Sequence, residues 1–308
     1  MKNYPVKSVN DIFRDRFGGK FSDHQPLSEV MPMGMGGVSS LFVDALTVVD
    51  LVDAAKLAVA NKRPYRVIGA GTATLIGESG FPGLIIKNST RNIFRLDNSS
   101  RVVCDSGVDN ALLVNSMASQ GLGGIELLVT VPGTVGGATI TNAQSSNWKF
   151  LSYIREICIF DPDLLKIRTL EARELGSKLI SSLFSANLVF PPVLLTVTVQ
   201  LAMLSQQEII RRLSAIKNRS TRFPAPVLGN VFSGEFKDIE IGREFNKQLK
   251  ILGLAYDNKR DWLMVKRSST PSKVRQGLTM LGEKIQQRGV ENHPRITYLG
   301  YYQEDDEH

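Results

Sequence analysis

The feature that most constrains this chain is a cluster of glycines near its middle. Six of the chain's 26 glycines lie within 17 positions: Gly121, Gly123, Gly124, Gly133, Gly136 and Gly137. Such density in a folded chain indicates backbone that approaches another group closely or adopts positive φ angles. Consecutive backbone amides in such a turn can hold a pyrophosphate without a lysine. A tight connection between buried strands is the alternative explanation, and the spacing alone does not separate the two.

A second glycine-rich loop precedes this cluster. The strand predicted at YRVIG (65–69) runs into GAGTATLIGESGFPG (69–83), and a second apolar strand, LIIKN (84–88), follows. A Rossmann phosphate loop must pass from a strand directly into a helix and carry a third glycine at its sixth position. Here the loop joins two strands, and Thr74 occupies the place of the third glycine. The sequence therefore excludes a dinucleotide site of the Rossmann type.

The composition is that of a folded protein that needs neither a disulfide nor a metal site for its stability. The chain has 308 residues, of which 43% are hydrophobic and 22% charged, and a chain of this length can bury about 75% of the surface that its unfolded form exposes. Cys104 and Cys158 lie in apolar runs, so we interpret them as core residues of a reducing compartment. His24, His293 and His308 are far apart in sequence, so we expect no metal site.

The start of the chain lacks the apolar core of a signal peptide, and no long apolar stretch follows. A membrane-spanning helix needs about 18 or more consecutive apolar residues. We therefore expect a cytoplasmic protein with no membrane partner.

The chain carries a formal net charge of +7. Basic residues are frequent in its last third, for example in RRLSAIKNRSTR (211–222) and DNKRDWLMVKR (257–267). This charge suits an anionic partner such as a nucleotide diphosphate, or it forms a solvated surface. No RNP motif, zinc finger or helix-turn-helix pattern is present, so a nucleic acid is not the partner that we expect.

The remaining pattern predicts a mixed α and β chain that divides near residue 204. Thr47 precedes an apolar run with Asp50 three positions later, which predicts a capped helix over 48–62. Segment 146–204 has the pattern of strands, in ICIFD, KIRTL and VFPPVLLTVTVQL. We expect three parts: an N-terminal segment (1–34), a first domain (35–204) and a C-terminal domain (205–308). The C-terminal domain should contain helices at 206–218, around 240–252 and at 271–288, and a final strand at 295–300.

Six segments of the chain resemble, in order, the sequence of one flavoprotein family. ELLVTVPGTVGGATITNAQ resembles a signature in which GlE precedes PGTVGGA and NAG follows. QPLSEVMPMGMGG resembles the family's opening EPL…T…GG, and VIGAGTATLIGESGFPGLII resembles LGxGSNxLI…GFxGxVI. In the last third, RSTRFPAPVLGNVF, GLAYDNKRDWLMV and HPRITYLG resemble R…QP…GSVF, G…S.KHAxFxVN and EPEVxxIG. The family is that of UDP-N-acetylenolpyruvoylglucosamine reductase (MurB).

The resemblance implies a fold and a cofactor. The implied fold class is α+β: a two-subdomain FAD-binding domain of the p-cresol methylhydroxylase and vanillyl-alcohol oxidase type, followed by a smaller α+β C-terminal domain that holds substrate. FAD would be bound without a covalent bond, since neither glycine loop contains a histidine. The residues that match the family's two cofactor loops are Gly69, Ala70, Gly71, Thr72 and Ala73 in the first, and Pro132, Gly133, Thr134, Gly136, Gly137 and Ala138 in the second.

The family's catalytic positions are substituted in this chain. The family reaction moves hydride from NADPH through the flavin to an enolpyruvyl double bond, while a serine supplies a proton and an arginine and a glutamate stabilise charge. The serine of GSVF matches Asn230, the glutamate of EPEV matches Arg295, and the arginine of YRxS matches Ile180. The histidine and asparagine of KHAxFxVN match Arg260 and Lys266. Arg260, Lys266 and Arg295 either bind an anionic substrate in the cleft or belong to the surface.

Three classes of function agree with these observations. The first is an FAD-dependent oxidoreductase of peptidoglycan precursor synthesis, a divergent or weakly active UDP-N-acetylmuramate dehydrogenase. If active, it would use NADPH and would need another proton source, such as Tyr256, Tyr298 or an ordered water. The second is a non-catalytic protein that binds FAD or a UDP-sugar in a regulatory role. The third is nucleic-acid binding, with affinity that falls steeply with salt. The sequence leaves open which class holds, and it does not reveal the oligomeric state.

Overall fold

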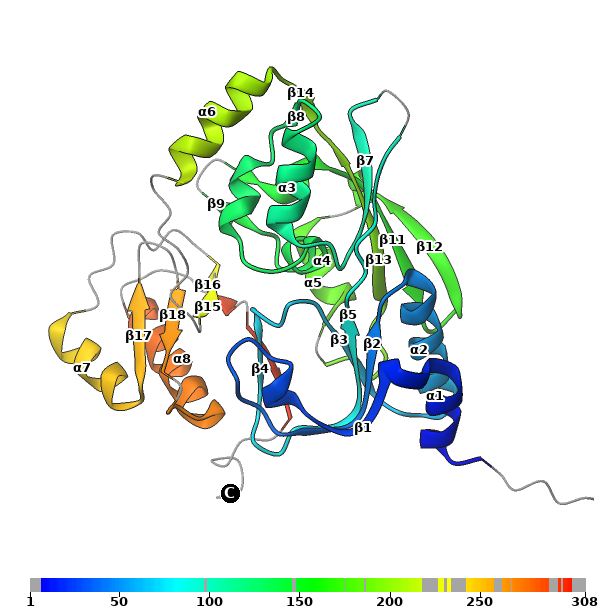
Figure 1. Ribbon diagram of the computed structural model, residues 1–308. Coiled ribbons are helices and arrows are strands. Elements are labelled where there is room, and N and C mark those ends of the chain that lie inside the picture. Colours follow the sequence, from blue (N-terminus) through cyan, green and yellow to red (C-terminus); the bar gives the residue numbers. More distant parts are fainter. Residues whose placement is uncertain are drawn as a thin grey trace, which may run out of the picture.

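The structure of the chain is a computed structural model. It describes residues 7–96, 99–145, 148–174, 176–185, 187–217, 227–229, 232–233, 242–257, 262–266, 268–287, 293–294 and 296–300. Within these residues the chain forms two sheet layers with helices on their outer sides, and a smaller region of helices and short strands lies beside them (Figure 1).

The first layer is a four-stranded sheet. In spatial order its strands are β1 (Phe21–Pro26), β2 (Val38–Ala45), β5 (Phe81–Asn88) and β3 (Tyr65–Ile68). β2, β5 and β3 run parallel, and β1 is antiparallel at the edge. Parallel strands that are covered on both faces need apolar side chains on both faces. Leu84, Ile85 and Ile86 of β5 are accordingly all fully buried.

Helix α2 (Val48–Ala60) begins where the sequence predicts, and it packs with α1 (Val9–Phe17) beside this sheet. The Thr47 hydroxyl accepts a hydrogen bond from the Asp50 amide, and the Asp50 carboxylate accepts one from the Thr47 amide. Burial alone would raise the pKa of the Asp50 carboxyl, but hydrogen bonds from Lys20 and Thr47 outweigh it and leave the pKa below its usual value. The predicted capping pair is therefore confirmed.

The second layer is a five-stranded antiparallel sheet. In spatial order its strands are β12 (Lys166–Glu171), β11 (Ile154–Asp161), β13 (Val193–Gln200), β7 (Arg101–Asp105) and β6 (Ile93–Arg95). β11, β12 and β13 confirm the strands predicted within 146–204. β13 starts only after Pro191 and Pro192, because proline cannot donate to the ladder.

Three helices share the apolar core of the second sheet. They are α3 (Asn110–Ala118), α4 (Val135–Ile140) and α5 (Ser177–Leu183). Helix α5 lies between β12 and β13 in the chain and was not predicted, since strand signals flank it on both sides. The two layers also share a core, in which Phe160, Val193 and Leu195 of the second sheet pack with residues of the first.

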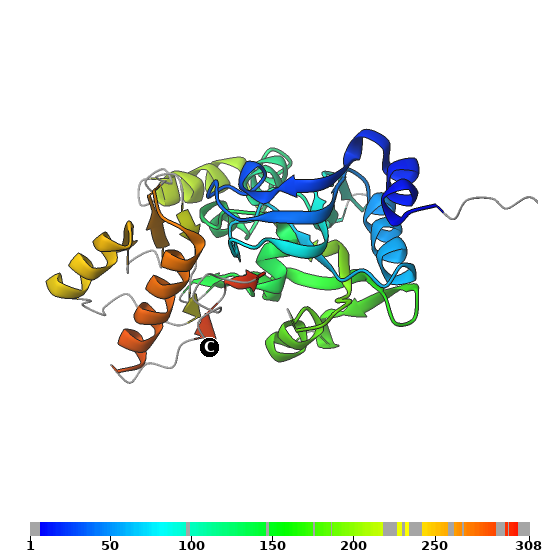
Figure 2. The same ribbon diagram turned by 90° about the horizontal axis from the view of Figure 1, so that it is seen from below.

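The C-terminal region lies to one side of the two layers in both views (Figures 1 and 2). It contains α6 (Gln206–Lys217), α7 (Arg243–Ile251) and α8 (Pro271–Gln286), which match the predicted helices, and a sheet in the order β15 (Val227–Gly229), β18 (Trp262–Val265) and β17 (Leu254–Asp257). Its apolar core also includes Met33, Met35 and Leu75 from the N-terminal half of the chain. The domain boundary near residue 204 remains a prediction.

Pairs of short strands complete the fold. They are β4 (Thr74–Ile76) with β20 (Thr297–Leu299), β8 (Leu122–Gly123) with β14 (Ala202–Met203), β9 (Gln144–Ser145) with β10 (Trp148–Lys149), and β16 (Phe232–Ser233) with β19 (His293–Pro294). β20 confirms the predicted final strand. In the described part of the chain, no helix combines the length and apolar character needed to cross a membrane.

Candidate functional site

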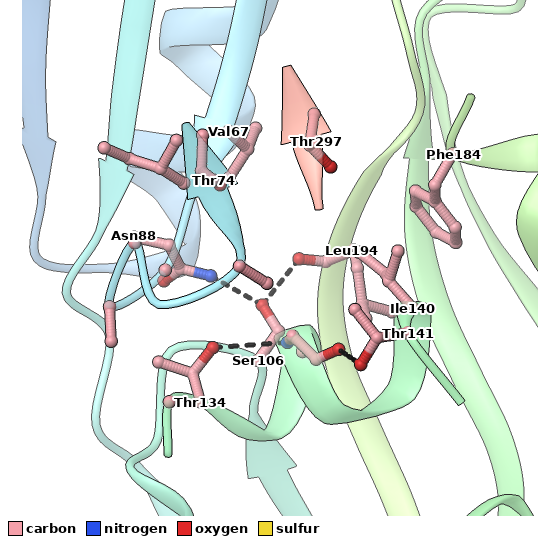
Figure 3. A pocket seen from close by; sticks show the side chains of 18 of the residues that line it. Val67, Thr74, Asn88, Ser106, Thr134, Ile140, Thr141, Phe184, Leu194 and Thr297 are labelled. Carbon is pink, nitrogen blue, oxygen red and sulfur yellow. Dashed lines mark hydrogen bonds between the residues drawn. The ribbon is translucent and has the colours of Figure 1, made fainter. Parts of the chain in front are cut away.

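A cavity lies between the two sheet layers, and both glycine-rich loops line it (Figure 3). Its walls come from the end of β3, the loop after it, helix α4, the start of β13 and strand β20. The empty volume is about 1230 Å³, including space that is open to solvent.

The first loop follows β3 and turns back into β4. The amides of Ala70, Gly71, Thr72 and Ala73 donate no hydrogen bond to any described part of the chain. Gly71 adopts a φ of +74°, which an L side chain rarely tolerates. Gly71 is buried, Thr72 and Ala73 are half-buried and Ala70 is exposed. A run of amides around a turn forms a concavity that binds anions. The first loop therefore has the donors for a phosphate or diphosphate.

The second loop precedes and begins helix α4, and the amides of its residues 135–138 are already used. The amides of Gly133 and Thr134 donate no hydrogen bond to any described part of the chain. The amides of Val135 and Gly136 donate to the carbonyls of Val108 and Ser106, both at 2.8 Å. The amide of Gly137 donates to the Thr134 hydroxyl at 3.3 Å, and that of Ala138 to the Thr134 carbonyl at 2.8 Å. A Cβ added to Gly136 would lie 2.8 Å from the Ser106 oxygen. The second loop thus forms a close-packed wall.

The two loops contact one another directly. The Thr72 hydroxyl donates to the Pro132 carbonyl at 3.0 Å. A Cβ added to Gly69 would lie 2.5 Å from the Thr134 hydroxyl oxygen. Thr72 and Pro132 are 60 residues apart in the sequence. Their hydrogen bond therefore fixes the first loop relative to the second.

Two consecutive hydrogen bonds, Asn88–Ser106–Leu194, connect strands next to the cavity (Figure 3). The Asn88 side-chain amide donates to the Ser106 hydroxyl at 2.7 Å, and that hydroxyl donates to the Leu194 carbonyl at 2.6 Å. These bonds connect the end of β5 in the first sheet with β7 and β13 of the second. Sequence reasoning did not identify Asn88 or Ser106. Their position directly after buried strands is the signal that could have found them.

Arg66 is the one charged residue among the described residues that line the cavity. Its guanidinium donates to the carbonyls of Tyr65 and Val189 and lies 5.6 Å from the centre of the Phe81 ring. Burial lowers the pKa of Arg66 from its usual value. Sequence reasoning missed this residue too, because a single arginine within a strand carries no distinctive spacing.

Of the residues predicted for catalysis and substrate binding, the structure describes two, and neither lines this cavity. Ile180 is fully buried on α5, packs into the core of the second sheet and does not line the cavity. Lys266 follows β18, is exposed and is likewise absent from the lining. Asn230, Arg260 and Arg295 lie outside the described residues.

The cavity fits the predicted cofactor in its chemistry. The four amides of the first loop without a partner in the described chain suit a diphosphate. Apolar side chains of Val67, Ile68 and Leu194 line the same cavity and suit flat rings that are buried from water.

Comparison with known proteins finds similarity to FAD-binding proteins. Residues 39–161 match the model of the FAD binding domain family. A UDP-N-acetylenolpyruvoylglucosamine reductase from Prochlorococcus marinus is 24% identical over 298 residues, which cover 91% of this chain and 97% of that protein. The reductase from Rhodopirellula baltica is 29% identical over 174 residues. The matched region spans about half of the length of these relatives: 56% of the Rhodopirellula baltica reductase and 51% of the one from Geobacter metallireducens.

A solved structure has the same overall fold. The crystal structure of UDP-N-acetylenolpyruvylglucosamine reductase (MurB) from Thermus caldophilus matches with a TM-score of 0.65 and 17% identity, over 91% of this chain and 98% of that chain. The fold and the matched domain define an α+β protein with a two-subdomain FAD-binding domain and a smaller C-terminal part. Within that class, the chain is similar over nearly its whole length to UDP-N-acetylenolpyruvoylglucosamine reductases (MurB).

Proposed function

We propose that this chain holds FAD in the cavity between the two glycine loops and acts as an oxidoreductase of peptidoglycan precursor synthesis in the cytoplasm. The observation that carries the proposal is the row of amides from Ala70 to Ala73, which line the cavity without an acceptor in the described chain. The relatives' name, UDP-N-acetylenolpyruvoylglucosamine reductase, supports a UDP-sugar that carries an enolpyruvyl group as the substrate. NADPH would be the reductant.

Each part of the cavity has a defined role in this proposal. When bound, FAD would accept a hydride from the reductant and pass it to the substrate's double bond. The amides of residues 70–73 would hold the diphosphate, and the second loop, from Pro132 to Ala138, would press against the cofactor from the opposite wall. The Asn88–Ser106–Leu194 chain would keep the second wall fixed and free of water-filled gaps.

The proton required for the reduction would come from an unusual source. By the resemblance, Ile180 matches the family's arginine, and its buried aliphatic side chain neither donates a hydrogen bond nor carries charge. Tyr256 and Tyr298 do not line the cavity as described, so an ordered water becomes the proposed donor. Loss of a general acid or a charge-stabilising group commonly costs about 10² to 10⁴ in rate. We therefore propose a divergent reductase with a low turnover rate.

A second candidate is a non-catalytic protein that binds FAD or a UDP-sugar and has a regulatory role. The buried Ile180 supports it, because the residue that the resemblance matches to the family's arginine packs in the apolar core. The two candidates differ in redox competence. A reductase must be reduced by NADPH and reoxidised by substrate, whereas a binding protein need only hold its ligand.

The visible absorption spectrum of the purified protein tests both candidates. NADPH and then UDP-N-acetylglucosamine enolpyruvate would be added without oxygen to protein that has been loaded with FAD. Bleaching of the flavin band by NADPH and its recovery with the enolpyruvate would support the reductase. Bleaching without recovery would mean another substrate, and no bleaching would support the binding role. A protein that takes up no FAD would refute both.

Reintroduction of the family's groups provides a gain-of-function test. The double variant Asn230→Ser with Arg295→Glu should reduce the enolpyruvate substrate faster than the wild type, because it restores a hydroxyl proton donor and a carboxylate. The corresponding single variants are its controls. An unchanged rate in the double variant would mean that these two positions do not limit the reaction.

A further inference from the structure

The C-terminal strand β20 lies directly along the segment that follows the first glycine loop. β20 pairs in parallel with β4, so that Thr297, Tyr298 and Leu299 lie beside residues 74–76. The Thr297 amide donates to the Ala73 carbonyl at 2.9 Å, and the Gly77 amide donates to the Leu299 carbonyl at 2.8 Å. Ala73 is the last residue of the amide row that lines the cavity. The end of the cofactor loop is therefore held by the end of the chain.

β20 is also a wall of the cavity. Thr297 (Figure 3) and Leu299 line it, and both come from a region more than 200 residues away from the first loop. Ile296, just before the strand, packs in the core of the C-terminal region together with Leu75 of β4. Strand residues alternate between the two faces, so β20 places one face toward the cavity and the other toward the C-terminal core.

Two further contacts dock the C-terminal region on the same segment. The Glu78 carboxylate accepts hydrogen bonds from the amide and the hydroxyl of Ser272, at 2.9 and 2.7 Å, in the first turn of α8. Gly300 adopts a φ of +78° immediately after β20, and a Cβ added there would lie 1.9 Å from the Gly80 carbonyl oxygen. Residues 73–80 thus contact both β20 and the start of α8.

We propose that docking of β20 and α8 on residues 73–80 positions the amides that hold FAD, so that cofactor binding and docking of the C-terminal region are coupled. The inference rests on the proposed FAD site. It adds that the matched FAD-binding domain, residues 39–161, is not sufficient for cofactor binding. Coupling between two sites is reciprocal: FAD should tighten the docking of β20 by the same factor by which docking tightens FAD. Glu78 acts as a positioning residue, through Ser272.

The test compares variants of the docking contacts with matched controls in the full-length chain. Gly300→Ala and Glu78→Ala should each raise the dissociation constant for FAD by about tenfold, within the usual range of coupling. Gly242→Ala is the control for the first, because Gly242 also has a positive φ, +82°, but no atom within 4 Å of an added Cβ. Glu244→Ala on α7, an exposed carboxylate that pairs with Lys247, is the control for the second. Both controls should stay within about twofold of the wild type.

Two measurements separate a positioning role of Glu78, which acts on the amides of the first loop, from a role in stability alone. Glu78→Gln keeps an oxygen that accepts from Ser272, so its FAD affinity should return close to that of the wild type. Hydrogen exchange of the Gly77 and Thr297 amides should slow by about tenfold when wild-type protein binds FAD. The thermal midpoint of each variant without FAD identifies any variant that has lost the fold, and the wild-type exchange measurement needs no variant.

The outcomes distinguish this inference from the proposed function. A wild-type protein that binds no FAD overturns the proposed function. A wild type that binds FAD, with unchanged exchange at Gly77 and Thr297 and with wild-type affinity in Gly300→Ala and Glu78→Ala, overturns the coupling alone. Weaker binding in both variants, with rescue by Glu78→Gln and slower exchange in the wild type, supports it.

Discussion

The two glycine-rich loops have similar compositions but different backbone chemistry. In the first, the amides of residues 70–73 have no acceptor in the described chain. In the second, the amides from Val135 to Ala138 all donate to neighbouring backbone or to Thr134. Both loops line the same cavity. The first loop is suited to receive an anion, whereas residues 135–138 of the second loop are suited to bring two segments close together.

The difference shows that glycine density does not by itself mark an anion site. The densest cluster, between Gly121 and Gly137, raised two explanations: a pyrophosphate nest and a tight connection between buried segments. For residues 135–138 the hydrogen bonds favour the second explanation, since Gly136 packs against the Ser106 backbone. Amides without an acceptor in the described chain are found in the first loop, from Ala70 to Ala73, and at Gly133 and Thr134, just before residues 135–138. Which loop contributes more to cofactor affinity is a question that substitutions can decide.

The largest expected effect is on stability, at Gly136. Gly136→Ala places a Cβ 2.8 Å from the Ser106 oxygen and 2.9 Å from its Cβ, and overpacking of this kind costs about 1–3 kcal/mol. We expect the free energy of unfolding without FAD to fall by about 3 kcal/mol, at the upper end of this range, because the nearest atom belongs to the backbone and cannot rotate away. Chemical denaturation monitored by circular dichroism measures it.

Gly137→Ala is the matched control for that prediction. Gly137 lies next to Gly136 in α4, but its added Cβ would meet no atom closer than 3.6 Å. Alanine is favoured over glycine within a helix by up to about 1 kcal/mol, so the free energy of unfolding should stay constant or rise slightly. Equal losses in the two variants would contradict the assignment of Gly136 as the point of close approach.

The next effect is on cofactor affinity, at Gly71. Gly71→Ala forces an L side chain into a φ of +74° and against Met31, which should turn the neighbouring amides away from the cavity. We expect the dissociation constant for FAD to rise by about tenfold, equivalent to 1.4 kcal/mol. Flavin fluorescence during titration measures it.

Gly34→Ala separates this effect from backbone strain alone. Gly34 has a similar φ of +63°, but an added Cβ would meet no atom within 4 Å, and the residue does not line the cavity. Both variants should lose about 1–2 kcal/mol of stability, but only Gly71→Ala should lose FAD affinity. If Gly34→Ala weakened FAD binding as much, the amide row would not be the anion receptor.

Much of this architecture could be predicted from local sequence. Capping of α2 by Thr47 and Asp50, the strands of the second sheet and the helices of the C-terminal region depend on residues close together in the chain. The resemblance of PGTVGGA and its neighbours to a known family identified the fold and the cofactor, which the matched FAD-binding domain and the Thermus caldophilus structure confirm.

The parts of the site that were not predicted depend on contacts between distant segments. Arg66, Asn88, Ser106 and Thr297 line the cavity, but none has a spacing that links it to the others. Ser106 meets Asn88 through packing of the two sheets, and Thr297 reaches the cavity through pairing of β20 with β4. Composition and periodicity do not specify such pairings. The roles of the individual glycine-loop residues toward FAD remain predictions.

The smallest expected effect is on the connection between the two loops, at Thr72. Thr72→Val keeps the shape of the side chain but removes the hydroxyl that donates to the Pro132 carbonyl at 3.0 Å. A hydrogen bond of this kind contributes about 0.5–1.5 kcal/mol, so the FAD dissociation constant should rise by about three- to fivefold. Thr72→Ser retains the hydroxyl and should bind FAD as the wild type does. If valine and serine at this position gave the same affinity, the loops would hold their spacing without this bond, and the close packing of Gly69 against Thr134 would be sufficient to set it.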